Sequence, residues 1–297
     1  MKIKLLVISI VISALIPSAA FALQILDGQN NQNVDLGFSA QAYAVVDLSD
    51  NKILAEKNFS QAWPPASLTK LVSAMVVLDM KPNLTKSVAM VKKDEVGGAR
   101  LATKVGIKYK IKDLFYASMV ASANNAVNAL ARSTGLTREK FVEKMNIKAK
   151  ELGAVNTVFY EPTGINEKNQ TTAEDYVKIA KAAYEYPEIA DASSRENYTV
   201  VSTSNKKYTH RLKNTNKLLK ESSFSILGKT GYLEESKYNF ASVVTDKFGN
   251  KFSLVLLGSD SPSLQFREIR ELAGLGTLIK SFKTASGIFP GAEKNIN

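Results

Sequence analysis

The sequence predicts a two-lobed α/β protein, in which an antiparallel sheet flanked by helices carries an inserted, mostly helical lobe. Strand-like segments occur early, within residues 40–56, and return late, within residues 225–258, while the pattern of residues 111–186 predicts helices. Strands from both ends of a chain can join one sheet, so the helical run between them forms a second lobe. A cleft between two such lobes is a natural binding site.

The first elements are a strand pair and a buried helix. Residues 42–47 have a strand-like pattern, Asp50-Asn51 marks a turn, and residues 52–56 return as the partner strand. Residues 67–80 place apolar side chains at helical spacing, and the positions between them are also almost all apolar. This pattern predicts a helix that is buried on nearly all sides.

The middle of the chain predicts a run of helices at residues 113–120, 125–133 and 137–152. Gly135 and Gly153 stand where the C-terminal caps of helices belong. These helices form the expected inserted lobe, at about residues 80–190.

One further helix and the returning strands complete the predicted fold. Residues 171–175 have capping-box spacing at the start of a helix, and Pro187 is expected to end that helix at about Tyr186. Three strand-like segments and a closing amphipathic helix follow, at residues 225–232, 238–245, 251–258 and 262–282.

The N-terminus predicts export. Lys2 and Lys4 precede an apolar run at residues 5–16, and Ala20-Phe21-Ala22 supplies a small-x-small cleavage site. We therefore expect a signal peptide at residues 1–22, cleaved after about Ala22, and a periplasmic protein. The apolar run is shorter than the roughly 20 residues of a membrane span, and an uncleaved N-terminal anchor is the alternative.

The amino-acid composition excludes several kinds of catalytic and metal site. The chain has no cysteine and one histidine, which excludes thiolate chemistry, Cys-ligated metals and multi-His metal sites. We expect no metal and no cofactor. The net charge of +11 favours anionic partners, and in an exported protein these are wall polymer or lipid heads rather than nucleic acid. A solubility role for this charge is an equally open interpretation.

Ser67 and Lys70 are the first candidates for catalysis. Residues i and i+3 share one face of a helix, so the hydroxyl and the amine can meet within one turn. A serine becomes a nucleophile when a base takes its proton, and lysine is such a base only when its pKa falls from about 10.4. The apolar helix and its N-terminal dipole both favour that fall, and a second cation nearby adds to it.

Two later elements complete a set with Ser67 and Lys70. Ser122 and Asn124 form a Ser-x-Asn pattern in a loop between two predicted helices, and Lys229-Thr230-Gly231 lies on a predicted strand. Each short pattern alone is weak. In this order, and in helix, loop and strand context, the set is highly specific.

These motifs resemble the penicillin-recognising serine enzymes, most closely the low-molecular-mass D,D-peptidases. Residues 65–70, 120–126 and 227–232 match that family's pattern, and the resemblance covers roughly residues 40–282. Residues 161–164, Glu-Pro-Thr-Gly, resemble the D-alanyl-D-alanine endopeptidase branch. The resemblance implies a β-lactamase/transpeptidase-like fold. The expected organisation is a signal peptide, a polar leader, a catalytic domain and a C-terminal tail, at residues 1–22, 23–39, 40–284 and 285–297.

The resemblance also implies roles for each motif. Ser67 attacks the carbonyl of a D-Ala and forms an acyl-enzyme, Lys70 accepts its proton, and Ser122 relays a proton to the leaving amine. Asn124 orients the bound peptide and Lys70.

The strand motif is expected to bind the substrate. Lys229 and Thr230, with Gly231, bind the carboxylate next to the scissile bond, which suits a cation and a hydroxyl. Backbone N–H groups of Ser67 and Tyr232 form the oxyanion hole. The implied partners are peptidoglycan stem peptides and, as covalent inhibitors, β-lactams; loose membrane association is a further expectation. Endopeptidase activity is favoured over carboxypeptidase activity.

The sequence supports three alternative functions less well than a D,D-peptidase. A Ser-His-Asp triad needs His210, which follows polar residues and lacks a Gly-x-Ser-x-Gly partner, so a solvated histidine is the better interpretation. A serine β-lactamase shares the motifs but needs a water-activating base, and Glu161 is a weak candidate for it. A non-catalytic peptidoglycan-binding protein fits the basic charge but has no use for all three motifs together.

Overall fold

The structure is a computed structural model that describes residues 36–286. The expected signal peptide (1–22), most of the polar leader (23–39) and most of the C-terminal tail (285–297) lie outside the described residues. Within the described range, no helix combines the length and the apolar character that crossing a bilayer requires.

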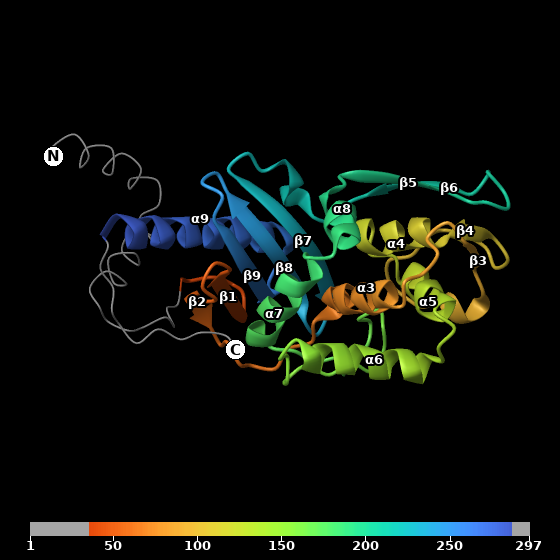
Figure 1. Cartoon of the computed structure of the whole chain (residues 1–297), viewed down its shortest axis with the longest axis horizontal. Coiled ribbons are helices and arrows are strands. Elements are labelled where there is room, and N and C mark those ends of the chain that lie inside the picture. The colour runs from red at the N-terminus through yellow and green to blue at the C-terminus, as the bar shows by residue number, and fades with distance from the viewer. Residues whose placement is uncertain (1–35, 287–297) are drawn as a thin grey trace.

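One five-stranded antiparallel sheet joins strands from both ends of the chain, as predicted (Figure 1). Its strand order is β2-β1-β9-β8-β7, so the early strand β1 pairs directly with the late strand β9. The strands are β1 (Ala42–Asp47), β2 (Ile53–Lys57), β7 (Phe224–Leu233), β8 (Lys237–Asp246) and β9 (Lys251–Ser259). The predicted sheet is confirmed, and β7 is left as an edge strand.

Helices cover both faces of the sheet. Successive residues of a strand point to opposite faces, and Tyr43 and Val45 pack with Phe266 and other side chains of α9 (Pro262–Ser286). Helix α7 (Ala173–Ala183) covers the other face, where it packs against β1, β8 and β9. The part of the molecule around the sheet therefore has three layers.

The inserted lobe is mostly helical and lies beside the sheet (Figure 1). Helix α3 (Lys70–Asp79) lies at its centre, in contact with the helices α4 (Ile111–Val120), α5 (Asn124–Ser133) and α6 (Arg138–Glu151). The short α8 (Pro187–Ser194) packs on α4. Although α7 falls within the expected range of the lobe, it lies on the sheet.

Two small hairpins in the lobe were not predicted. They pair β3 (Ser87–Ala89) with β4 (Lys108–Lys110) and β5 (Asn197–Val201) with β6 (Thr209–Lys213). The first strands have three residues each, and the second pair is largely exposed. Strands of three residues are too short to show a pattern, whereas the second pair alternates polar residues with Tyr198, Val200 and Leu212, a strand signal that was missed.

Pro187 begins a helix, whereas we expected it to end one. Helix α7 starts after Thr172, whose side chain caps it as predicted, and ends at Ala183 instead of Tyr186. Pro187 then occupies the first turn of α8. The first turn of a helix leaves backbone N–H groups unpaired, so the missing N–H of a proline costs nothing there.

Candidate active site

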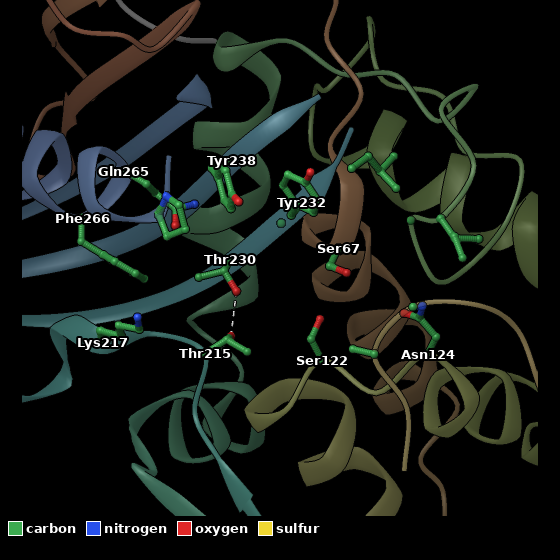
Figure 2. A pocket seen from close by; sticks show the side chains of 17 residues that line it. Ser67, Ser122, Asn124, Thr215, Lys217, Thr230, Tyr232, Tyr238, Gln265 and Phe266 are labelled. Carbon is green, nitrogen blue, oxygen red and sulfur yellow. Dashed lines mark hydrogen bonds between the residues drawn. The ribbon is translucent and has the colours of Figure 1, made fainter. Parts of the chain in front are cut away.

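A cleft of about 440 Å³ lies where the edge strand β7, the start of α3 and the loop before α5 meet (Figure 2). Six of the residues predicted from the motifs line it: Ser67, Ser122, Asn124, Thr230, Gly231 and Tyr232. The two predicted lysines are buried behind its wall, with Lys70 at 0% and Lys229 at 1% exposure. The structure therefore brings all three motifs to one place.

Ser67 and Lys70 meet across a turn that is tighter than expected. A 3-10 helix, η1 (Ala66–Thr69), precedes α3, and Lys70 caps its C-terminal end. Side chains at i and i+3 eclipse in a 3-10 turn, and the Nζ of Lys70 lies 2.7 Å from the Oγ of Ser67. The predicted juxtaposition is present, on a 3-10 turn instead of an α-helical one.

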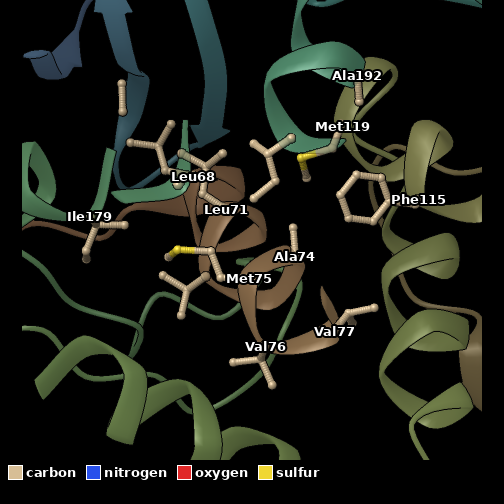
Figure 3. Close-up of a cluster of buried hydrophobic side chains, with 14 of the residues drawn as sticks. Leu68, Leu71, Ala74, Met75, Val76, Val77, Phe115, Met119, Ile179 and Ala192 are labelled. Carbon is tan, nitrogen blue, oxygen red and sulfur yellow. The ribbon is translucent and has the colours of Figure 1, made fainter. Parts of the chain in front are cut away.

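The apolar packing of α3 fixes this pair in position. Leu68 and Leu71, on either side of Lys70, are fully buried. Figure 3 shows side chains of α4, α7 and α8 gathered around α3, among them Phe115 and Ile179. Because the interior is close-packed, η1 and α3 hold Ser67 in a nearly fixed position.

The surroundings of Lys70 disfavour the charged form of its amine. Burial lowers the pKa of the Lys70 amine well below its usual range, and the charge of Lys229 lowers it further, while Glu161 partly opposes the shift. A neutral amine has a lone pair that can accept the hydroxyl proton of Ser67. The second cation anticipated from the sequence is thus Lys229.

A buried loop after α6 supports Lys70 from behind. The Nζ of Lys70 lies 2.5 Å from the backbone oxygen of Thr163. The Glu161 carboxylate accepts hydrogen bonds from the Thr163 backbone N–H at 2.7 Å, the Thr163 hydroxyl at 2.6 Å and the Gly164 N–H at 2.5 Å. Glu161 is 3% exposed. Its carboxylate therefore shapes the loop that holds Lys70, and it does not line the cleft.

Ser122 reaches the cleft from a strained backbone position. Its φ of +57° lies in the left-handed region, which non-glycine residues rarely adopt and which often marks functional sites. The Nζ of Lys229 donates to the Ser122 Oγ at 2.9 Å and to the Thr230 backbone oxygen at 2.9 Å. Burial lowers the pKa of Lys229 to about 7.

Asn124 was expected to orient Lys70, but it makes no hydrogen bond to Lys70 within residues 36–286. Its Nδ2 donates to the Gly97 backbone oxygen at 2.7 Å, while its buried Oδ1 has no hydrogen-bond partner in residues 36–286. Within the same range, the hydrogen bonds of Lys70 go to Ser67 and Thr163. The orientation of Lys70 thus comes from the loop at Thr163, and the Oδ1 of Asn124 is unpaired at the cleft.

Strand β7 approaches η1 closely at Gly231. A Cβ at this position would lie 2.8 Å from the Pro65 backbone oxygen and 3.2 Å from the Ser67 backbone nitrogen. Glycine at this position therefore lets β7 bring the Tyr232 backbone beside that of Ser67. The Thr230 hydroxyl donates to the Thr215 hydroxyl at 2.7 Å (Figure 2).

His210 lies outside the cleft. It is on β6, partly buried, with its Nε2 3.1 Å from the Tyr109 hydroxyl, and burial lowers its pKa. It was interpreted as solvated, and that detail is wrong, because β6 packs its ring against the Tyr109 ring.

Several residues of the site were not predicted from the sequence to belong to it. The Thr163 backbone oxygen, Thr215 and Lys217 contribute through contacts between segments that are far apart in the chain. Glu161 was noted in a family pattern, but its role in shaping the loop has no signal in residue spacing.

The comparisons with known proteins are consistent with one another. A family model described as D-alanyl-D-alanine carboxypeptidase matches residues 29–261. A D-alanyl-D-alanine endopeptidase of Haemophilus influenzae is 33% identical over 207 residues, covering 69% of this chain and 70% of that relative. D-alanyl-D-alanine carboxypeptidase DacF of Bacillus subtilis is 30% identical over 275 residues, covering 90% and 68%.

A solved structure has the same fold. The DD-transpeptidase of Streptomyces K15 superposes with a TM-score of 0.75 at 28% identity, covering 81% of this chain and 97% of that one. The transpeptidase-like fold predicted from the motifs is thereby confirmed.

Proposed function

This chain belongs to the D-alanyl-D-alanine carboxypeptidase family of serine peptidases, and from this premise we propose that it hydrolyses D-Ala-containing peptide bonds of peptidoglycan through an acyl-enzyme on Ser67. The observation that carries the proposal is the buried Lys70, whose amine pKa is lowered and whose Nζ lies 2.7 Å from the Ser67 Oγ, at the wall of an open cleft. Ser122 is also bonded to a buried lysine, Lys229, but the pKa of Lys70 is lowered by the Lys229 charge as well as by burial.

Acylation needs one proton to move from the nucleophile to the leaving group. The Ser67 oxygen attacks the D-Ala carbonyl as its proton passes to the Lys70 amine. When the C–N bond breaks, the Ser122 hydroxyl gives its proton to the leaving amine and takes in its place the proton held by Lys70, while Lys229 stays bonded to Ser122. Water then hydrolyses the Ser67 ester by the reverse path, which releases the acid and restores both side chains.

The substrate is proposed to bind along β7. Thr230 and Lys229, with Gly231, hold the carboxylate next to the scissile bond, and Asn124 offers its unpaired Oδ1 to a peptide N–H. The backbone N–H groups of Ser67 and Tyr232 stabilise the oxyanion, a kind of donor that is worth about 10²–10³ in rate.

Cleavage of cross-links is favoured over removal of a terminal D-Ala. The open cleft continues past Thr230, so it leaves room for a leaving group larger than alanine. The Haemophilus influenzae relative is named an endopeptidase, whereas the Bacillus subtilis relative is named a carboxypeptidase. Both reactions use the same acyl-enzyme.

A β-lactamase is the less favoured alternative. Its deacylation needs a carboxylate free to activate water, and the Glu161 carboxylate is occupied by the N–H groups and hydroxyl of its own loop. We propose instead that β-lactams acylate Ser67 and remain bound. The enzyme is proposed to act in the periplasm after cleavage near Ala22, with loose membrane association as a further hypothesis.

Labelled penicillin and muropeptides test this proposal. The purified protein should form a stable 1:1 adduct with penicillin and should convert cross-linked muropeptides to monomers, read by mass. Ser67→Ala should abolish both, and His210→Gln should change neither. Cleavage that survives in Ser67→Ala would assign the reaction to another nucleophile, and rapid penicillin turnover would identify a β-lactamase.

A further inference from the structure

The cleft continues beyond the predicted motif residues onto the α9 face of the sheet. Directly paired residues of antiparallel strands point to the same face, and Thr230 pairs with Phe240, which packs beneath α9. Lys229 pairs with Ala241 and points to the opposite face, toward Ser122. The two side chains thus leave β7 toward different faces, while the bonds from Thr230 to Thr215 and from Thr215 to Val120 keep the Thr230 hydroxyl at the Ser122 end of the cleft.

The extension beyond Thr230 has an aromatic lining. Tyr232 and Tyr238 form a cross-strand pair with ring centroids 4.5 Å apart, and Tyr232 is 54% exposed. Phe266 of α9 lines the same part of the cleft (Figure 2). Exposed aromatic faces in a cleft provide an apolar surface for the methylene groups of a ligand.

One exposed cation stands at the end of this aromatic surface. Lys217 is the first residue of η3 (Lys217–Lys220) and lines the cleft, with its Nζ 5.9 Å from the Phe266 ring centroid. Within residues 36–286 it has no ion pair. Its neighbour Lys220, by contrast, pairs with Glu196 at 3.0 Å and does not line the cleft.

The other polar groups nearby already have hydrogen-bond partners within the protein. The Gln265 amide is buried and donates to the Asn239 backbone oxygen at 2.6 Å. The Thr230 hydroxyl is bonded to Thr215. Lys217 is therefore the exposed cation among the described residues that line the cleft, and Figure 2 shows it on the far side of Thr230 from Ser67.

We propose that Lys217 binds a second, distal carboxylate on the leaving group, and that it favours leaving residues with an aliphatic side chain ending in an anion. This inference rests on the proposed function, because it takes Thr230 as the site of the first carboxylate. The side chain of the leaving D-residue crosses Tyr232 and Tyr238 and ends at Lys217. A diamino acid with a second, free carboxyl group that joins two peptide stems has this shape, whereas terminal D-Ala does not.

A matched pair of substrates isolates the contact. One is an acyl-D-Ala-D-aminoadipate, and the other is the same peptide with its side-chain carboxyl converted to the primary amide. The unmodified enzyme should cleave the acid with a kcat/KM about fivefold above that of the amide, as one partly exposed charge-assisted hydrogen bond supports. Lys217→Gln should equalise the two substrates, Lys217→Glu should reverse the preference, and Lys217→Arg should retain it.

Lys220→Gln is the control, since it removes a lysine from the same turn outside the cleft and should leave the preference intact. A preference for the acid that persists in Lys217→Gln would overturn the inference, as would its loss in Lys220→Gln. Calorimetric binding of both peptides to Ser67→Ala repeats the comparison without turnover. A protein that fails to cleave or to take up penicillin thus refutes the proposed function alone, while equal binding of the two peptides refutes the role of Lys217 alone.

Discussion

The Nζ of Lys229 lies 2.9 Å from the Oγ of Ser122 and so joins the edge strand of the sheet to the loop between α4 and α5 across the cleft. Ser122 needs such a partner, because its φ of +57° is an unfavourable conformation for serine. The same lysine contributes to the lowered pKa of Lys70. One buried cation thus acts on the proposed proton relay and on the proposed base.

The pH profile of acylation should reflect both lysines. Acylation needs Lys70 neutral, so the rate falls when the pH drops below its lowered pKa. It also needs Lys229 charged, and because burial lowers the pKa of Lys229 to about 7, the rate falls again above that pH. In Lys229→Arg the alkaline limb should disappear, since arginine stays charged. The measurement is the second-order rate of penicillin labelling against pH, and an unchanged alkaline limb in a folded Lys229→Arg protein would contradict the assignment.

The buried lysines should also make the protein less stable at lower pH. The folded pKa of Lys229 is about 7 and the unfolded value is about 10.4, so between these values the unfolded chain binds the extra proton. The free energy of unfolding therefore rises with pH across this window, by up to about 1.4 kcal/mol per pH unit for one group. Urea unfolding at a series of pH values measures this slope. In Lys229→Met the slope should decrease, whereas in Lys220→Met, which removes an exposed lysine, it should stay unchanged. Equal slopes in the two variants would show that Lys229 keeps its proton in the folded state.

Patterns within single segments made most of the fold predictable. The short apolar runs in residues 42–47 and 238–258, bounded by turn signals, and the helical spacing of residues 67–80 depend only on neighbouring residues. The hairpin β5–β6 also alternates, with Tyr198, Val200 and Leu212 on its inner face, and it was missed because exposed polar and charged residues make up most of both strands.

The contacts of the site also fall into local ones, which the sequence predicts, and long-range ones, which it does not. Ser67 and Lys70 are three residues apart, so local geometry predicted their contact. The contacts of Lys70 with Thr163 and of Thr230 with Thr215 join separate segments of the chain. Nothing in their spacing indicates that the fold brings them together, because that depends on the packing of whole elements.

Glu161 should act through the loop that holds Lys70. Glu161→Ala leaves the buried N–H groups of Thr163 and Gly164 without their acceptor, which should lower the free energy of unfolding by about 3 kcal/mol. The Thr163 oxygen then loses its fixed position beside Lys70, so acylation by penicillin should slow by about tenfold or more. Glu161→Gln keeps one acceptor oxygen, so its stability and its acylation rate should lie between those of the unmodified protein and those of Glu161→Ala. The acylation rates of both variants are measured with labelled penicillin, and their stabilities by chemical unfolding.

The alternative role for Glu161 gives a different result. A water-activating base is needed for deacylation alone. Acylation at the normal rate with a long-lived adduct found only in Glu161→Gln would therefore identify a β-lactamase and contradict the loop-shaping role.

Gly164 should be the least replaceable glycine near the site. Its φ is +82°, and an added Cβ would overlap the Ala66 backbone oxygen directly before the nucleophile. Gly249, in the turn between β8 and β9, is the matched control, because its φ is +83° but a Cβ there has nothing within 4 Å. Gly249→Ala bears the left-handed strain alone, about 1 kcal/mol, and should keep full acylation. Gly164→Ala bears the same strain plus a clash between two backbones that close packing cannot relieve, so it should lose several kcal/mol and most of its acylation rate. Thermal unfolding and penicillin labelling of both variants make the comparison, and similar losses in the two would mean that η1 does not rest on Gly164.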